Sequence, residues 1–219
     1  IVANGASLYS TESSSNTAYG NKSGTSMSSP SVTGSLGLLQ QHYKNNNGGS
    51  FMRAATLKAL VIHTADEAGN ANGPDYQNGW GLMNTKTAAD VITNRDVSSK
   101  IEEETLNNSS TYTLQVNATG SGPLVATIAW TDVAGTPVAP ALDPSNRMLV
   151  NDLDIRITRN GTTYFPWKLN PANPSAAATT GDNDRDNVEK IFIANAPAGT
   201  YTITVTHKGT LSGSSQAFS

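Results

Sequence analysis

The residues with the clearest chemical potential lie in a short run at positions 24–34, which reads GTSMSSPSVTG. A glycine here leads a hydroxyl residue into the first turn of an expected helix. In that turn the main-chain N–H of Ser26 has no partner within the helix, and the positive end of the helix dipole points the same way. A carbonyl attacked by Ser26 would find a hydrogen-bond donor for its developing negative charge. The pattern fits nucleophilic catalysis, although a serine that only caps a helix shows the same local features.

The full length of the run favours the catalytic interpretation. It resembles the nucleophile motif of the subtilisin-like serine proteases, Gly-Thr-Ser-Met-Ala-x-Pro-x-Val-x-Gly, with Ser28 where alanine is usual. The segment around Tyr9 and Tyr19 resembles the strand and loop that lead into this nucleophile, and GWGLMN at 79–84 resembles a turn near the end of the catalytic domain. The resemblance implies a secreted endopeptidase that acts on protein or peptide substrates through an acyl-enzyme on Ser26.

The other members of a Ser-His-Asp triad are not found ahead of Ser26. In subtilases the aspartate and the histidine precede the serine in the chain. Residues 1–25 contain neither type. The resemblance therefore implies that both lie upstream of Ile1, that this chain is a C-terminal fragment, and that it is inactive alone.

The three histidines of the chain are interpreted as structural. His42 follows Ser26 on the same expected helix, about 24 Å away at 1.5 Å per residue, which is too far for a general base. His63 ends an expected helix, where a cation suits the dipole. His207 lies among expected strands.

Helical periodicity is confined to the first part of the chain. It predicts helices at 26–43, 51–64 and 85–93, after a short strand near 6–10. In the first of these helices, Leu36, Leu39 and Tyr43 form part of one apolar stripe. Gly34 and Gly37 lower its helix propensity, which indicates that another backbone packs closely and that the helix is buried.

From about Val97 the period changes to two. Strands are predicted at 111–116, 124–130, 153–157 and 200–206, without an intervening helix, as in an antiparallel sandwich or jelly roll. LVNDLD at 149–154 and GTYT at 199–202 resemble the C-terminal jelly-roll domain of certain secreted alkaline subtilases, which is related to the P domain of kexin-like convertases.

Two domains are therefore expected. Residues 1–96 would be the C-terminal part of a three-layer α/β catalytic domain of the subtilisin type. Residues 97–219 would be an all-β antiparallel jelly-roll sandwich. An inactive protein of the subtilase fold, or a fragment whose sandwich serves as a binding or stabilising module, is the alternative reading.

Acidic residues in the second part suggest a metal. Asp152, Asp154, Asp182, Asp184 and Asp186 lie in two short stretches with few cations beside them in the sequence. Neighbouring carboxylates repel unless they are solvated or neutralised. Ca²⁺ takes six to eight oxygen ligands and would suit them as a structural ion. The alternative is a turn whose Asn and Asp side chains hydrogen-bond their own backbone.

Composition narrows the classes of partner. The net charge of −3, with 14% charged residues, argues against nucleic acids and anionic membranes. The chain has no cysteine, which removes disulfides, a thiol nucleophile and a cysteine zinc site. No apolar run approaches the roughly 18 residues that span a bilayer. The sequence leaves the oligomeric state open.

Overall fold

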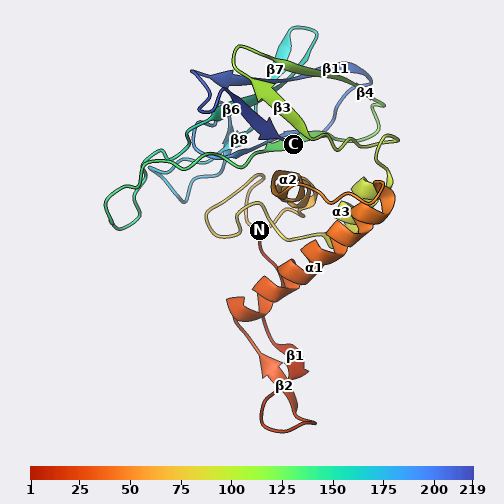
Figure 1. The fold of residues 1–219 in the computed structure, drawn as a ribbon, viewed down its shortest axis with the longest axis vertical. Coiled ribbons are helices and arrows are strands. Elements are labelled where there is room, and N and C mark those ends of the chain that lie inside the picture. Colours follow the sequence, from red (N-terminus) through yellow and green to blue (C-terminus); the bar gives the residue numbers. More distant parts are fainter.

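The computed structural model describes all of residues 1–219, and strands make up most of its regular structure (Figure 1). The helices are α1 (Thr25–Asn46), α2 (Ala54–Thr64) and α3 (Thr85–Thr93). The strands are β1 (Leu8–Thr11), β2 (Tyr19–Lys22), β3 (Glu104–Asn107), β4 (Tyr112–Ala118), β5 (Leu124–Ala129), β6 (Asp152–Arg159), β7 (Thr162–Tyr164), β8 (Trp167–Lys168), β9 (Thr179–Thr180), β10 (Val188–Ile193), β11 (Gly199–Lys208) and β12 (Ser215–Phe218).

The three predicted helices are confirmed, with shifts at both ends of α1 and at the start of α2. α3 has the predicted bounds, and the Asn84 side chain caps it by accepting a hydrogen bond from the N–H of Thr87 at 2.9 Å. α2 begins later than predicted because Arg53 is still extended, with φ −61° and ψ 159°. The helices pack around a small apolar cluster of Leu39, Tyr43, Met52, Leu60, Val61, Ala88 and Ile92.

The expected burial of α1 is wrong for this chain. Among its residues only Leu39 and Tyr43 are buried, and Leu38 is 64% exposed. A side-chain carbon added at Gly34 or Gly37 would meet no atom within 4 Å. The physical reason is visible in Figure 1, where the β1–β2 hairpin and the first turns of α1 extend away from the other helices and the sheets.

Strands of the second part lie in two layers that share one core. The sheet β4-β11-β6-β7 is antiparallel throughout, and β10 pairs with β5. β12 pairs with β3, and its residue Phe218 also forms a bridge with Trp130, the residue that follows β5. The jelly-roll connections and the three-layer α/β arrangement stay predictions. The core consists of Leu106, Ala126, Ile128, Trp130, Leu153, Ile155, Ile157, Ile191, Ile193, Ala196, Tyr201, Ile203, Val205, Leu211 and Phe218.

The two parts of the chain touch through α2 and β5. Ala59 and Ile62 of α2 pack with Ala129 and Val188 in a second small cluster. A polar contact lies beside it, where the Lys190 ammonium donates to the carbonyl of Ile62 at 2.8 Å. The boundary predicted near residue 96 falls in the connection between α3 and β3. The division into two domains stays a prediction.

Substitution of Leu39 should separate packing from helix propensity. Leu39 is 1% exposed in the helical cluster, whereas its neighbour Leu38 is largely in solvent. Leu39→Ala should destabilise the helical part by about 2–5 kcal/mol, because it removes buried methyl groups and leaves a cavity. Leu38→Ala should change stability by less than about 0.5 kcal/mol. Urea unfolding followed by circular dichroism compares them, and equal losses would contradict the packing described.

Candidate functional site

Ser26 is the second residue of α1, and its side chain is exposed. The N–H of Met27 turns back to the carbonyl of Gly24 at 3.0 Å, whereas the N–H of Ser26 donates to no other group. Gly24 precedes the helix with φ 152°, a conformation that favours glycine. The start of α1 therefore offers a hydroxyl and a free main-chain donor on the same residue.

A glycine that the sequence reasoning passed over shapes this turn. The N–H of Gly24 donates to the carbonyl of Gly5 at 2.8 Å. A side-chain carbon on Gly5 would lie 2.8 Å from the carbonyl oxygen of Gly24 and 3.1 Å from the Cβ of Ser28. Only glycine fits this approach without a shift of the backbone. The signal in the sequence was a lone glycine ahead of a strand, which does not reveal a contact nineteen positions away.

The turn at 79–84 holds the two ends of this region together. Leu82 exchanges two hydrogen bonds with Asp66, each 2.9 Å long, and the N–H of Val2 donates to the carbonyl of Gly81 at 2.9 Å. Gly81 has φ 104°, and a side-chain carbon there would collide with the carbonyl oxygen of Asp66. The second glycine of the Gly-Trp-Gly sequence is thus required by close backbone packing.

The histidines make structural contacts and none of them contacts Ser26, but His63 is not the cation that was expected at the end of its helix. Loss of solvation, helped by the nearby Lys190 charge, lowers the pKa of His63 to about 4, so this ring is neutral at pH 7. The contacts are His42 Nε2 with Thr93 Oγ1 at 2.9 Å, His63 Nδ1 with Thr127 Oγ1 at 3.1 Å, and His207 Nε2 with the N–H of Ser109 at 2.9 Å.

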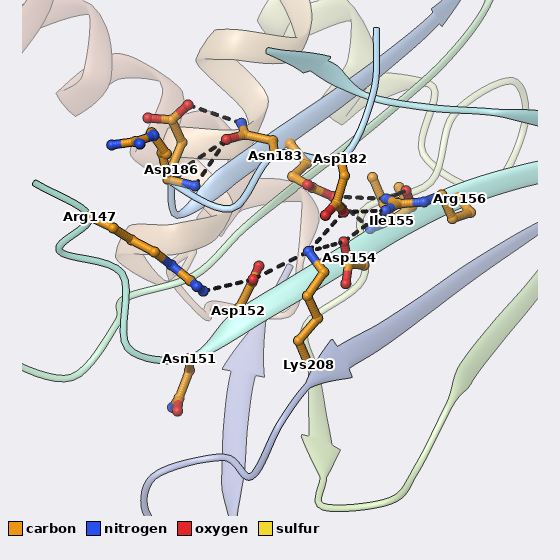
Figure 2. Close-up of polar contacts among 12 residues, drawn as sticks. Arg147, Asn151, Asp152, Asp154, Ile155, Arg156, Asp182, Asn183, Asp186 and Lys208 are labelled. Carbon is orange, nitrogen blue, oxygen red and sulfur yellow. Dashed lines mark hydrogen bonds and ion pairs between the residues drawn. The ribbon is translucent and has the colours of Figure 1, made fainter. Parts of the chain in front are cut away.

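The structure brings three of the five predicted metal ligands together, around a lysine (Figure 2). The Lys208 ammonium on β11 lies 2.7 Å from Asp182 Oδ1, 3.1 Å from Asp154 Oδ1 and 3.3 Å from Asp152 Oδ2. The antiparallel register places Lys208 directly opposite Asp152 on β6. The lysine therefore occupies the centre of this carboxylate group.

Two arginines complete the ion-pair cluster. Arg156 Nη2 lies 2.8 Å from Asp154 and 2.7 Å from Asp182, and Arg147 Nη2 lies 2.8 Å from Asp152. The premise that these carboxylates lack a nearby cation is wrong. The neutralising charges come from other strands and loops, which the order of residues along the chain does not show.

The remaining predicted ligands lie apart from Lys208. Asp186 accepts a hydrogen bond from the Asn183 amide at 2.9 Å, and Asn183 Oδ1 accepts the N–H groups of Arg185 and Asp186 at 3.2 and 3.4 Å. This is the self-bonded turn weighed as the alternative, and Asp184 makes no hydrogen bond or ion pair. No group of three or more His, Asp or Glu side chains is arranged to hold a metal. Calcium binding stays a prediction.

Glu189 is a buried acid that the sequence reasoning did not single out as a site residue. It is 0% exposed on β10. Its Oε2 accepts the N–H of Ile155 at 2.7 Å, while Oε1 has no partner. Burial raises the pKa of Glu189 to about 8, although that hydrogen bond acts in the opposite direction. The signal was an acidic residue inside the mostly apolar strand VEKIFI.

Glu189 should make stability fall with rising pH. Its folded pKa of about 8 exceeds the ordinary value of 4.5, so the folded state keeps a proton that the unfolded state releases. The stability of Glu189→Gln relative to the wild type should therefore increase from pH 5 to pH 9, by roughly 4 kcal/mol at about 1.36 kcal/mol per pKa unit. Urea unfolding across that range measures the difference. Glu102→Gln is the control, and a gap for Glu189→Gln that does not change with pH would refute the assignment.

The part of the chain that carries Ser26 is similar to known proteins. Residues 1–81 match the model of the subtilase family. Over 90 residues the chain is 39% identical to a protein of Serratia marcescens named extracellular serine protease. That match covers 39% of this chain and 8% of the Serratia protein. None of the three helices combines the length and the apolar character that a membrane span requires.

Proposed function

We propose that this chain, whose residues 1–81 match the model of the subtilase family, is part of an extracellular serine endopeptidase whose nucleophile is Ser26. The observation that carries the proposal is the position of Ser26. It lies at the exposed start of α1, behind a glycine in the left-handed region, with its own N–H free. The Serratia relative, which is named an extracellular serine protease, supports the same reaction and location.

In the proposed reaction Ser26 Oγ attacks the carbonyl carbon of a peptide bond. A histidine accepts the serine proton and later passes it to the departing amine, while an aspartate orients that histidine. The free N–H of Ser26 donates to the oxyanion of the tetrahedral intermediate, aided by the positive end of the α1 dipole. Water then hydrolyses the acyl-enzyme ester and restores the hydroxyl.

The proton acceptor must come from outside this chain. His42, His63 and His207 hold other contacts, and no Asp or His lies between residues 1 and 25. We propose that the family's aspartate and histidine belong to polypeptide that precedes Ile1. The exposed face of α1, with open space at Gly34 and Gly37, is consistent with such a neighbour.

Residues 1–219 alone should not hydrolyse peptides. In subtilisin itself, loss of a triad residue lowers turnover on the order of 10⁴- to 10⁶-fold. A fluorogenic peptide assay on purified material should give only background, and Ser26→Ala should leave that background unchanged. Turnover at an ordinary protease rate, lost in Ser26→Ala, would show that this chain holds its own general base.

Reactivity of Ser26 should appear when the upstream polypeptide is present. A fluorophosphonate probe should then label one serine, and Ser26→Ala should abolish the labelling. Ser28→Ala is the matched control, because Ser28 lies two residues after Ser26 in the same turn and its hydroxyl donates to the Thr25 carbonyl at 3.1 Å. It should keep full labelling. Labelling that persists in Ser26→Ala and is lost in Ser28→Ala would show that the nucleophile is Ser28 and not Ser26.

A further inference from the structure

One edge of β5 is only partly covered. On its other edge β5 pairs with β10 along its whole length. On the free edge, Ala129 exchanges two main-chain hydrogen bonds with Ser219, at 2.9 and 3.0 Å, next to the bridge between Trp130 and Phe218. On this edge, antiparallel pairing therefore reaches only Ala129, the last residue of β5.

Main-chain groups farther along this edge have no partner strand. The N–H of Trp130 points to the side of β10 and donates to the carbonyl of Asn187, the residue before β10, at 3.2 Å. Hydrogen-bonding direction alternates along an antiparallel strand. The main-chain N–H and C=O groups of Ala126 and Ile128 therefore point toward β10. Those of Val125 and Thr127 point to the same edge as those of Ala129. β5 has β10 as its sole partner strand, so these two residues leave two N–H and two C=O groups unpaired by a strand.

A cleft of about 570 Å³ lies beside this edge. β5 forms one wall, and β4 contributes Tyr112, Leu114 and Val116 from the opposite layer. α2, with His63, and the connection at 96–102 close the remaining sides. In Figure 1 the C-terminal end lies between α2 and the sheets, beside these elements. The cleft thus combines an apolar lining with a row of main-chain donors and acceptors.

This combination fits an extended polypeptide better than a small apolar molecule. A small apolar ligand would cover the main-chain groups of Val125 and Thr127 without bonding them, which is costly in a buried place. A strand would pair them while its side chains fill the cleft, as in other cases of strand addition to a sheet edge. We propose that the cleft beside β5 binds one extended strand, antiparallel to β5, in the register that Ser219 and Ala129 begin.

The proposed strand is attached through Ser219. Ser219 already sets its direction and register. An attached segment also avoids the loss of translational freedom that a separate peptide would suffer on binding. Its side-chain pattern follows from β5. Residues opposite Ile128 and Ala126 face the core and should be apolar, whereas the residue opposite Thr127 faces His63 and can be polar.

Amide hydrogen exchange tests the free edge on the chain as it stands. The amides of Val125 and Thr127 should exchange at least about tenfold faster than those of Ala126 and Ile128, because only the latter pair bonds β10. Equal protection of all four amides would overturn the proposal, because the edge would already be satisfied.

Extension of the chain tests the occupant. Six residues added after Ser219, with valine at the first, third and fifth positions and threonine between them, should raise Tm by about 3 °C or more. The same extension should slow exchange at Val125 and Thr127. The matched control has the same composition with valine at the second, fourth and sixth positions, and it should stabilise far less. Equal stabilisation by both extensions would reduce the effect to nonspecific burial and overturn the proposal.

Two proline variants of the extension test its hydrogen bonds to β5. A separate peptide tests whether the strand must be attached to the chain. Proline at the second added position removes an N–H aimed at Thr127 and should abolish the gain, whereas proline at the third position removes an N–H that points away from β5. The valine–threonine hexapeptide supplied as a separate molecule at equimolar concentration should have no effect on Tm. If it stabilised the chain as well as the extension does, the attachment through Ser219 would be wrong.

Discussion

The register between β6 and β11 is the constraint on which most of the second part of the structure depends. It places Ile155 opposite Val205 and Ile157 opposite Ile203 in the core, and the same register sets Lys208 against Asp152 at the end of the ladder. Because side chains alternate between the faces of a strand, a slip of one residue would expose the apolar set. Burial fixes the pairing, and the pairing then brings the charges together.

Alternating patterns made the long strands predictable, and the residues near Thr127, Ile155 and Ile203 lie in strands close to where the sequence places them. The ion-pair cluster could not be predicted in the same way. Lys208 and Asp152 are distant in sequence, and only the sheet register makes them neighbours. Counting charges near each aspartate in the sequence missed the cations that neutralise it. An acid inside an apolar strand, such as Glu189, is a better sequence signal of an unusual environment.

In the helical part, signals that act within a few residues predict where the helices lie but not what packs against them. Periodicity located α3, and the motif at 24–34 located the start of α1, because these signals act within a few residues. The inference from Gly34 and Gly37 to a buried helix required a neighbour that residues 1–219 do not provide. The same openness surrounds Ser26. Its motif was readable from the sequence, whereas the contact between Gly5 and Gly24 that shapes its turn was not.

The packing of α2 on β5 has a thermodynamic consequence. One face of β5 supports Ala59 and Ile62 of the helix, and one edge of the same strand borders the cleft. α2 also belongs to the helical cluster, to which it contributes Leu60 and α1 contributes Leu39. Such linkage is reciprocal, because a free-energy coupling between two sites has the same size from either side. The strands of the second part and the helical cluster are thus joined at α2, both by packing on β5 and by hydrogen bonds of Thr56, Lys58 and Ile62.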